Sequence, residues 1–312
     1  MKYVAKKMGV LIIMLFLVSF ITFIAFSVIP GDSAITSLGM DATEEEIEAI
    51  RESLGYNDPI LVRYGHWAAG AIRGDFGMST KYKVKVSTLI AAKLPVTITL
   101  AVIASLMILI IGVPLGIMIA KAKSKFAQSA IAFVTQIFMS IPPFFLGMLL
   151  TLVFGVILKW FTPGGYVSYK EDVGGYIYYL IFPALAMAIP KISMVAKFTA
   201  SSIRREMDLD YVRTAYSKGN TRNQVFNHHI VRNSMMPVVT FLGMVIADVL
   251  AGSIIVEQVF NLPGLGRLLV SSIGTRDLFV VQAIVLYVVT VVIVVNFVVD
   301  ILYQMIDPRV RI

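Results

Sequence analysis

The chain has 312 residues, of which 58% are hydrophobic and 15% are charged, and its formal net charge is +8. Soluble domains are usually about 45–50% apolar and about 25% charged, so this composition indicates a protein whose surface faces lipid. The sequence contains no cysteine, which excludes a disulfide framework, a thiolate zinc site and a cysteine nucleophile.

The N-terminus predicts a retained membrane anchor and not a cleaved signal peptide. Three lysines within the first seven residues precede an apolar stretch over residues 8–29. The apolar part of a signal peptide has only about 7–15 residues and ends at a small-residue cleavage site. Here Pro30-Gly31-Asp32 follows the apolar stretch instead.

Six stretches approach or exceed the roughly 20 mostly apolar residues that a helix needs to cross a bilayer. They are residues 8–29, 96–120, 131–158, 176–196, 237–256 and 279–305. They predict an all-α, polytopic membrane protein with six transmembrane helices, because barrel strands would alternate over segments of about 10 residues. Pro142-Pro143 predicts a kink or split in the third span. The fourth span contains Pro183, Pro190 and Lys191 and is the weakest.

The basic residues predict that both ends of the chain are cytoplasmic, because loops on that side carry an excess of lysine and arginine. With the N-terminus inside, the inner side receives eight basic residues between positions 191 and 232, against three acidic ones. It also receives Lys2, Lys6, Lys7, Lys121, Lys123, Lys125, Arg309 and Arg311. Topology thus accounts for most of the positive charge, and no nucleic-acid partner is expected.

The long first outer loop is predicted to hold two short helices. Thr43 and Glu46 form a capping box at the start of a helical pattern. Further on, residues 59–72 place Leu61, Tyr64 and Ala68 on one face, which predicts a helix lying on the outer surface of the membrane.

The segment 191–236, between the fourth and fifth spans, is predicted to be cytoplasmic and long enough to hold a binding site. Residues 212–218 read as a short helix that Gly219 ends, since glycine tolerates the left-handed conformation found after many helices. Taken alone, the segment also fits a basic loop that binds anionic lipid.

The same segment resembles the coupling motif of ABC importer permeases. Arg213-Thr214-Ala215 stands where that motif has Glu-Ala-Ala, Gly219 occupies its glycine position, and Pro237 matches a later proline. The Ile-x-Leu-Pro part of the motif is absent, because His229 to Arg232 occupy those places.

Short motifs along the chain carry a wider resemblance. They are PGD (30–32), LGYNDP (54–59), GDFGMS (74–79), KLPVT (93–97), SIPPF (140–144), EQVFNLPGLG (257–266) and DPRVR (307–311). In this order they resemble the B-type permease of the dipeptide, oligopeptide and nickel importer family, over essentially the whole length.

The resemblance implies the type I importer permease fold, with a first span that wraps a core of five. Residues 1–93 would form the anchor and outer loop, 94–306 the transmembrane domain with a coupling helix at about 210–224, and 307–312 a cytoplasmic tail. The implied function is that of a permease subunit in the bacterial plasma membrane. It would form half of the pathway of an ATP-driven, binding-protein-dependent importer of di- or oligopeptides.

The implied partners are a second, paralogous permease, two ATPase subunits, an extracytoplasmic binding protein and membrane lipid. ATP and Mg would bind to the ATPase subunits, and no cofactor is expected here, since the sequence lacks the G-x-x-x-x-G-K-[ST] phosphate loop. By resemblance, the coupling helix docks into an ATPase groove. Gly219 would allow the chain to turn sharply after the coupling helix, and the small side chain of Ala215 would let the helix fit closely into the groove. Arg213 and Lys218 would pair with acidic residues of the groove. Thr214 and Tyr216 belong to the same expected contact.

Polar residues within the spans are candidates for the pathway. Asp248 lies near the middle of the fifth span, where insertion scales assign an acid a cost of about 2.5–3.5 kcal/mol. It is expected either to attract the ammonium group of a peptide or to pair with a polar group of the partner permease. Gln136, Ser140 and Asn296 are candidates for wetting the pathway, although such residues also bond neighbouring helices. Asp300 is closer to the inner surface and is expected to be structural.

Other cargoes and other classes of protein are alternatives. Nickel, a metal chelate or an oligosaccharide fits the family resemblance, because the binding protein does most of the selecting. A channel would show a filter-like loop and self-assembly, and a membrane-embedded enzyme would need clustered His or Asp pairs. No metal site is expected at His228 and His229, since adjacent residues point about 100° apart on a helix.

The predicted orientation can be tested with topology reporters. A reporter fused after Ile312 should lie in the cytoplasm and one inserted at Gly70 should lie outside, because the basic residues favour that arrangement. Fluorescence and phosphatase fusions measure the two locations. The opposite pair of signals would overturn the orientation of every span.

Overall fold

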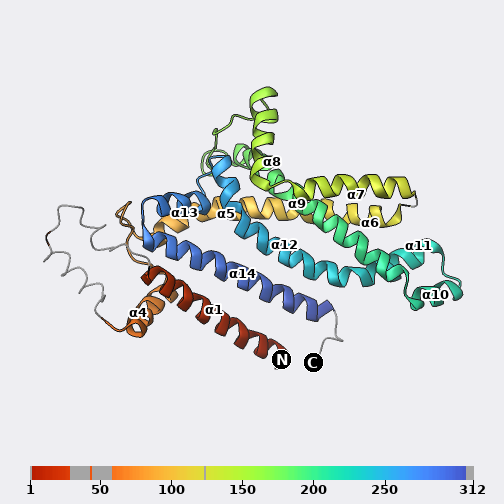
Figure 1. Cartoon of the computed structure of the whole chain (residues 1–312), viewed down its shortest axis with the longest axis horizontal. Helices are drawn as coiled ribbons and strands as arrows, with labels where there is room; N and C mark the ends of the chain where they lie inside the picture. The colour runs from red at the N-terminus through yellow and green to blue at the C-terminus, as the bar shows by residue number, and fades with distance from the viewer. Residues whose placement is uncertain (1, 29–42, 44–57, 123, 307–312) are drawn as a thin grey trace.

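The computed structural model describes residues 2–28, 43, 58–122 and 124–306, and the elements that it shows there are helices (Figure 1). In chain order these are α1 (Lys2–Val28), α4 (Ile60–Ile72), α5 (Val86–Met107), η1 (Ile108–Gly112), α6 (Val113–Lys121), α7 (Lys125–Ser140), α8 (Pro143–Leu150), η2 (Thr151–Ile157), α9 (Val173–Met207), α10 (Asp210–Ser217), α11 (Arg222–Gln224), η3 (Val225–Val231), α12 (Arg232–Val259), α13 (Leu265–Gly274) and α14 (Leu278–Ile306), where η marks a π-helical segment. The predicted all-α fold is confirmed.

Five helical stretches of the described chain are long and apolar enough to cross a membrane. A sixth is a bent pair, in which residues Gln128–Ser140 and Pro143–Ile157 meet at 96°. Pro142 and Pro143 explain the break, because neither can donate a backbone hydrogen bond and the residue before a proline avoids helical geometry. The predicted split of the third span is confirmed, and α8 projects from the bundle (Figure 1).

The span predicted to be weakest is the central one. α9 packs against α5, α6, α7, α8 and α12, and it is the most buried of the candidate spans. Its core residues include Ala184, Ala186 and Ala188, whose small side chains let neighbouring helices approach closely. A helix surrounded by protein needs less hydrophobicity than one that faces lipid, which explains its low hydropathy.

The segment predicted as a cytoplasmic connection is mostly helical. α9 continues to Met207, and α11, η3 and α12 form one helical stretch over Arg222–Val259. This end of the bundle, called the α10 end below, also holds the turn between α6 and α7. The first described residues of α1 and the last residues of α14 lie nearer to this end than the opposite ends of these two helices do (Figure 1). The segments predicted to share one side of the membrane therefore lie toward one end of the molecule.

Two contacts fix α1. The ammonium group of Lys7 is 2.6 Å from Asp300 Oδ2 on α14, which confirms a structural place for Asp300. At the other end of α1, Tyr64 of α4 is buried, and its ring packs against Phe20 and Phe23. The predicted helix over residues 59–72 is therefore present as α4. The PGD motif, the capping box at Thr43 and Glu46, and the tail 307–312 lie on or extend into residues outside the described set.

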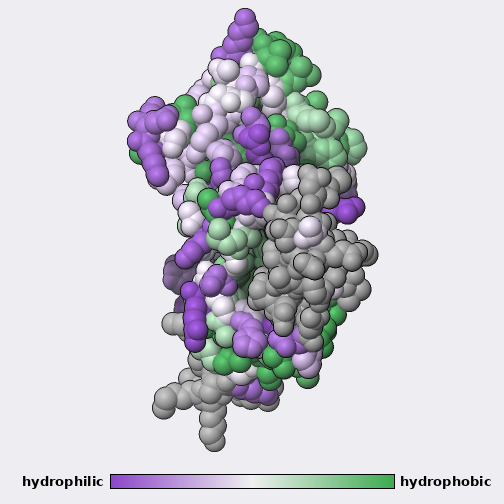
Figure 2. Space-filling model, turned by 90° about the vertical axis from the view of Figure 1, so that its left-hand side faces the viewer, coloured by the Kyte–Doolittle hydropathy of each residue, from purple (hydrophilic) through white to green (hydrophobic). Residues whose placement is uncertain are grey.

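At the opposite end, called the α13 end, a loop is tied to the start of α14. The Ser79 hydroxyl donates to Asp277 Oδ2 at 2.5 Å, and the Lys81 N–H donates to the same oxygen at 3.3 Å. Both Ser79 and Asp277 are buried. Hydrophilic residues gather over much of the described surface at this end (Figure 2), as expected for a surface in water.

The EQVFNLPGLG motif is a connection built around one buried carboxylate. Glu257, at the end of α12, is fully buried. Its Oε2 accepts the backbone N–H of Gly266 at 2.7 Å and that of Arg267 at 3.3 Å, and its Oε1 accepts the Thr97 hydroxyl at 2.7 Å. Gly266 and Arg267 belong to the first turn of α13, where a negative charge is favoured. Glu257 thus joins α5, α12 and α13.

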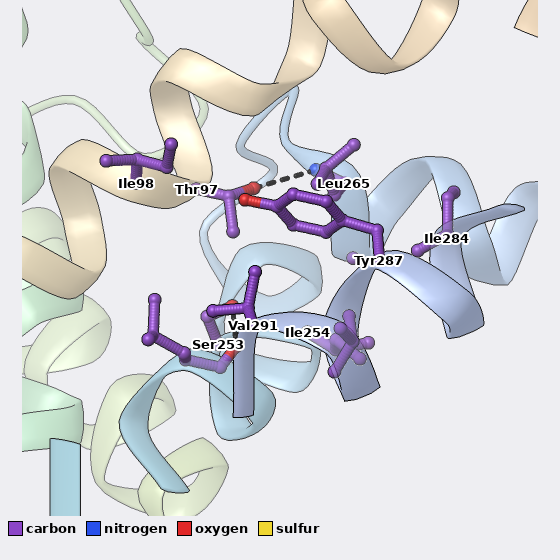
Figure 3. Close-up of a pocket in the computed structure, with 11 residues that line it drawn as sticks. Thr97, Ile98, Ser253, Ile254, Leu265, Ile284, Tyr287 and Val291 are labelled. Carbon is purple, nitrogen blue, oxygen red and sulfur yellow. Dashed lines mark hydrogen bonds between the residues drawn. The ribbon is translucent and has the colours of Figure 1, made fainter. Parts of the chain in front are cut away.

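Thr97 extends this network. Its hydroxyl oxygen accepts the backbone N–H of Leu265 at 2.9 Å, and Tyr287 of α14 points toward it (Figure 3). A cavity of about 20 Å³ lies between these residues, which is space for roughly one water molecule. Four helices therefore meet around Thr97 and Glu257 at the α13 end.

Removal of the Glu257 carboxylate should destabilise the protein. In the Glu257→Ala variant the donors at Thr97, Gly266 and Arg267 lose their acceptor, at about 1–3 kcal/mol for each group left unsatisfied. Gly266→Ala should also destabilise, since a Cβ there would lie 2.4 Å from Ile254 Cα. Thermal unfolding of the purified protein measures both effects.

Gly274→Ala is the matched control, because a Cβ at Gly274, also in α13, meets no atom within 4 Å. It should leave the unfolding midpoint unchanged. A wild-type midpoint for Glu257→Ala would show that the carboxylate is not the anchor described here.

Candidate functional site

The predicted short helix is α10, and Gly219 follows its end. α10 covers Asp210–Ser217, with Lys218 as its C-cap. Gly219 has φ of +82°, a left-handed conformation that side chains other than glycine rarely adopt, and a Cβ there would meet no atom within 4 Å. Glycine is therefore required by the backbone and not by space. The prediction of a glycine stop is confirmed.

α10 has one side packed on the chain and one side free. Val212 and Ala215 are buried in a cluster with residues of α6, α9 and η3. Arg213, Thr214 and Tyr216 are exposed. The Ala215 side chain therefore packs against its own chain, and its expected part in the contact with an ATPase stays a prediction.

Polar contacts hold α10 in place. The Tyr211 hydroxyl donates to Glu206 at 2.8 Å, and the Asn220 side-chain amide donates to the Ala215 carbonyl at 3.0 Å. Burial and the Glu206 carboxylate raise the pKa of Tyr211 to about 12. The hydroxyl is therefore protonated, and able to donate to Glu206, at physiological pH.

The helix expected at about 210–224 is two helices. α10 ends at Ser217, and Thr221 then caps a second helix in a capping box with Gln224. The exposed residues at the turn are Lys218 and Gly219. The free surface at this end thus consists of one side of α10 and the turn that follows it.

Asp248 has a partner in its own chain. Its Oδ2 forms an ion pair with the ammonium group of Lys191, so that α12 and α9 are joined. The expected partners were a peptide or a second permease, and the sequence interpretation missed Lys191. The sequence had suggested Lys191 as a charge that weakened the fourth span and as the first of the basic residues on the inner side, whereas the structure places it within α9 opposite Asp248.

The ion pair lines a cavity and remains accessible. The side chains of Lys191 and Asp248 are 22% and 58% exposed. The cavity is about 210 Å³ in volume. Its other lining residues are apolar: Pro143, Phe144, Met187, Val249, Gly252, Ile255 and Val256. A charged pair thus lies on an otherwise apolar surface of α8, α9 and α12.

The other pathway candidates do not line this cavity. Gln136 lies on α7, where its side-chain oxygen accepts a hydrogen bond from Lys197 of α9 at 2.9 Å. The Ser140 hydroxyl donates to the Gln136 carbonyl within α7. Asn296 is exposed on α14. The structure therefore joins Gln136 and Ser140 on one helix and leaves Asp248 and Asn296 on others.

Comparisons with known proteins cover the whole chain. A family model described as a binding-protein-dependent transport system inner membrane component matches residues 112–312, and the corresponding N-terminal model matches residues 1–101. A putative peptide transport system permease protein of Brucella abortus is 37% identical over 308 residues, which is 99% of this chain and 98% of that protein.

Two further relatives are similar over almost their full length. The oligopeptide transport system permease protein of Bacillus subtilis is 33% identical over 312 residues, covering 99% of each chain. The glutathione transport system permease protein of Escherichia coli is 36% identical over 311 residues, covering 100% of this chain and 99% of the relative.

Proposed function

Because the chain belongs to the family of inner membrane components of binding-protein-dependent transport systems, we propose that it forms half of the pathway through which an ATP-driven importer moves peptides. It is a multi-pass membrane protein and a transport component, not an enzyme. The peptide cargo is supported by the names of its full-length relatives, which include peptide and oligopeptide permeases.

The importer contains a binding protein that delivers the cargo and ATPase subunits that drive it. In the proposed assembly two ATPase subunits and a second, paralogous permease complete the complex, with both termini of this chain in the cytoplasm and membrane lipid around the spans. The two permeases face each other across the pathway. The accessible ion pair on α9 and α12 supports that placement, because charges facing lipid would be costly.

In this proposal the free side of α10 receives an ATPase subunit. Arg213, Thr214, Tyr216 and Lys218 are exposed there, whereas Val212 and Ala215 fasten α10 to α6, α9 and η3. A push on α10 would therefore move the ends of those helices. Gln136, Ser140 and Asn296 stay candidates for polar contacts within the pathway or between helices.

Reconstitution of the purified complex tests the proposed function. The tagged chain should co-purify with ATPase subunits and a second permease, and proteoliposomes should accumulate labelled peptide when ATP and the binding protein are present. Nickel ions and an oligosaccharide serve as competing cargoes. Uptake of either of these without peptide uptake would contradict the proposal.

Gly219→Val should uncouple ATP hydrolysis from transport. A β-branched residue resists the left-handed conformation at φ +82°, at about 1–2 kcal/mol, so the turn after α10 should be displaced. Peptide uptake and substrate-stimulated ATP hydrolysis should both fall while the membrane domain stays folded.

Gly219→Asn is the matched control, since asparagine visits this conformation more readily and a Cβ at this position would meet no atom within 4 Å. It should retain more coupling than the valine variant. Equal, normal coupling in both variants would count against a role for Gly219.

A further inference from the structure

The Lys191–Asp248 pair has the features of a site that exchanges partners. The two residues come from different helices, α9 and α12, and both are partly exposed to the same cavity. They are the charged residues among those that line it. With both present, the cavity has no net charge when it is empty, and neither ion is left alone in apolar surroundings.

Gly252 keeps the cavity open. It lies one turn after Asp248 on α12 and also lines the cavity, and a Cβ at this position would meet no atom within 4 Å. Glycine is a poor residue for the interior of a helix, and packing does not require it here. Its absence of a side chain leaves room beside the Asp248 carboxylate.

We propose that Lys191 and Asp248 form a subsite for the charged termini of a peptide, an inference that rests on the proposed function. The Lys191 ammonium group receives the C-terminal carboxylate, and the Asp248 carboxylate receives the N-terminal ammonium group. Phe144, Met187 and Ile255 supply apolar walls for the peptide side chains.

Charge balance makes this subsite selective. A zwitterion replaces one ion pair within the chain by two charge-assisted pairs, so no charge is left unpaired. A solute without charges cannot replace the pair. A simple cation or anion would satisfy one residue and leave the other alone in the cavity, which is costly. Peptides with both termini free are therefore favoured over blocked peptides.

A purely structural role is the competing explanation, in which the pair only fastens α9 to α12. The double variant Lys191→Gln with Asp248→Asn separates the two. It removes both charges, creates no unpaired ion, and keeps two side chains that can hydrogen-bond between the helices. If the pair has only a structural role, the double variant should keep the wild-type preference for peptides with free termini over blocked peptides.

The experiment measures uptake by the reconstituted complete transporter of two versions of one peptide, with free termini and with acetylated and amidated termini. Both are supplied on saturated binding protein, so that any difference arises after delivery. Wild-type protein should import the free peptide about tenfold faster, the effect of roughly one charge-assisted hydrogen bond. In the double variant this ratio should fall to about one, because uptake of the free peptide falls.

Gly252→Leu provides a second test that leaves the ion pair intact. It fills the cavity and should reduce uptake of the free peptide at least to the level of the blocked one. Gly9→Leu in α1, where a Cβ also meets no atom within 4 Å, is the control and should import both peptides normally. Normal uptake by the Gly252→Leu variant would contradict the subsite.

The outcomes distinguish this inference from the proposed function. If wild-type transporter imports neither peptide, the proposed function fails and the subsite fails with it. If wild-type protein imports peptides but the double variant keeps the wild-type ratio, only the subsite is refuted. A ratio near one in the double variant, with normal ATP hydrolysis, supports the subsite.

Discussion

A carboxylate within a membrane must be neutralised, and the account of this protein depends on how Asp248 meets that requirement. Its ion pair with Lys191 joins α12 to α9, the helix that packs against most of the other spans. The pair also remains open to a cavity on a surface that the described chain leaves uncovered. Charges are costly next to lipid, which supports the proposal that this surface borders an aqueous pathway.

The two ends of the bundle are built differently. At the α13 end, the buried Glu257 carboxylate binds the first turn of α13 and the Thr97 hydroxyl, and thereby holds three helices at fixed positions. At the α10 end, one short helix rests on α6, α9 and η3 through Val212 and Ala215. The Glu257 network thus holds the helices together at the α13 end, while one side of α10 is exposed at the other end. This arrangement fits the proposal that a partner acts on the domain through α10.

Hydropathy was enough to predict six spans, because a helix that crosses a bilayer needs about 20 mostly apolar residues. The split at Pro142-Pro143 was predictable from backbone chemistry alone. The length and central place of α9 were not, because a buried helix lined by small residues resembles a weak span. The end of α10 at Gly219 could be predicted from the sequence. The burial of Ala215 could not, because it depends on where α6, α9 and η3 lie.

The pairing of Lys191 with Asp248 was beyond the sequence, since it joins residues 57 positions apart on two helices. The available signal was one acid and one base in separate spans, which together favour an ion pair. Likewise, the EQVFNLPGLG motif could be recognised as a pattern. Its physical basis became visible only in the structure: the Glu257 carboxylate occupies the space that side chains at Gly264 and Gly266 would need.

The central claim, that the uncovered side of α12 borders a water-filled pathway, can be tested by single-cysteine labelling, since the chain has no native cysteine. Met244→Cys and Ile255→Cys, both exposed on α12, would be treated with a hydrophilic thiol reagent in the assembled transporter whose partner subunits lack cysteine. Ile13→Cys on the exposed side of α1 is the lipid-facing control. The account predicts labelling at both α12 positions that changes with ATP, and none at position 13. No labelling of α12 in any nucleotide state would contradict it.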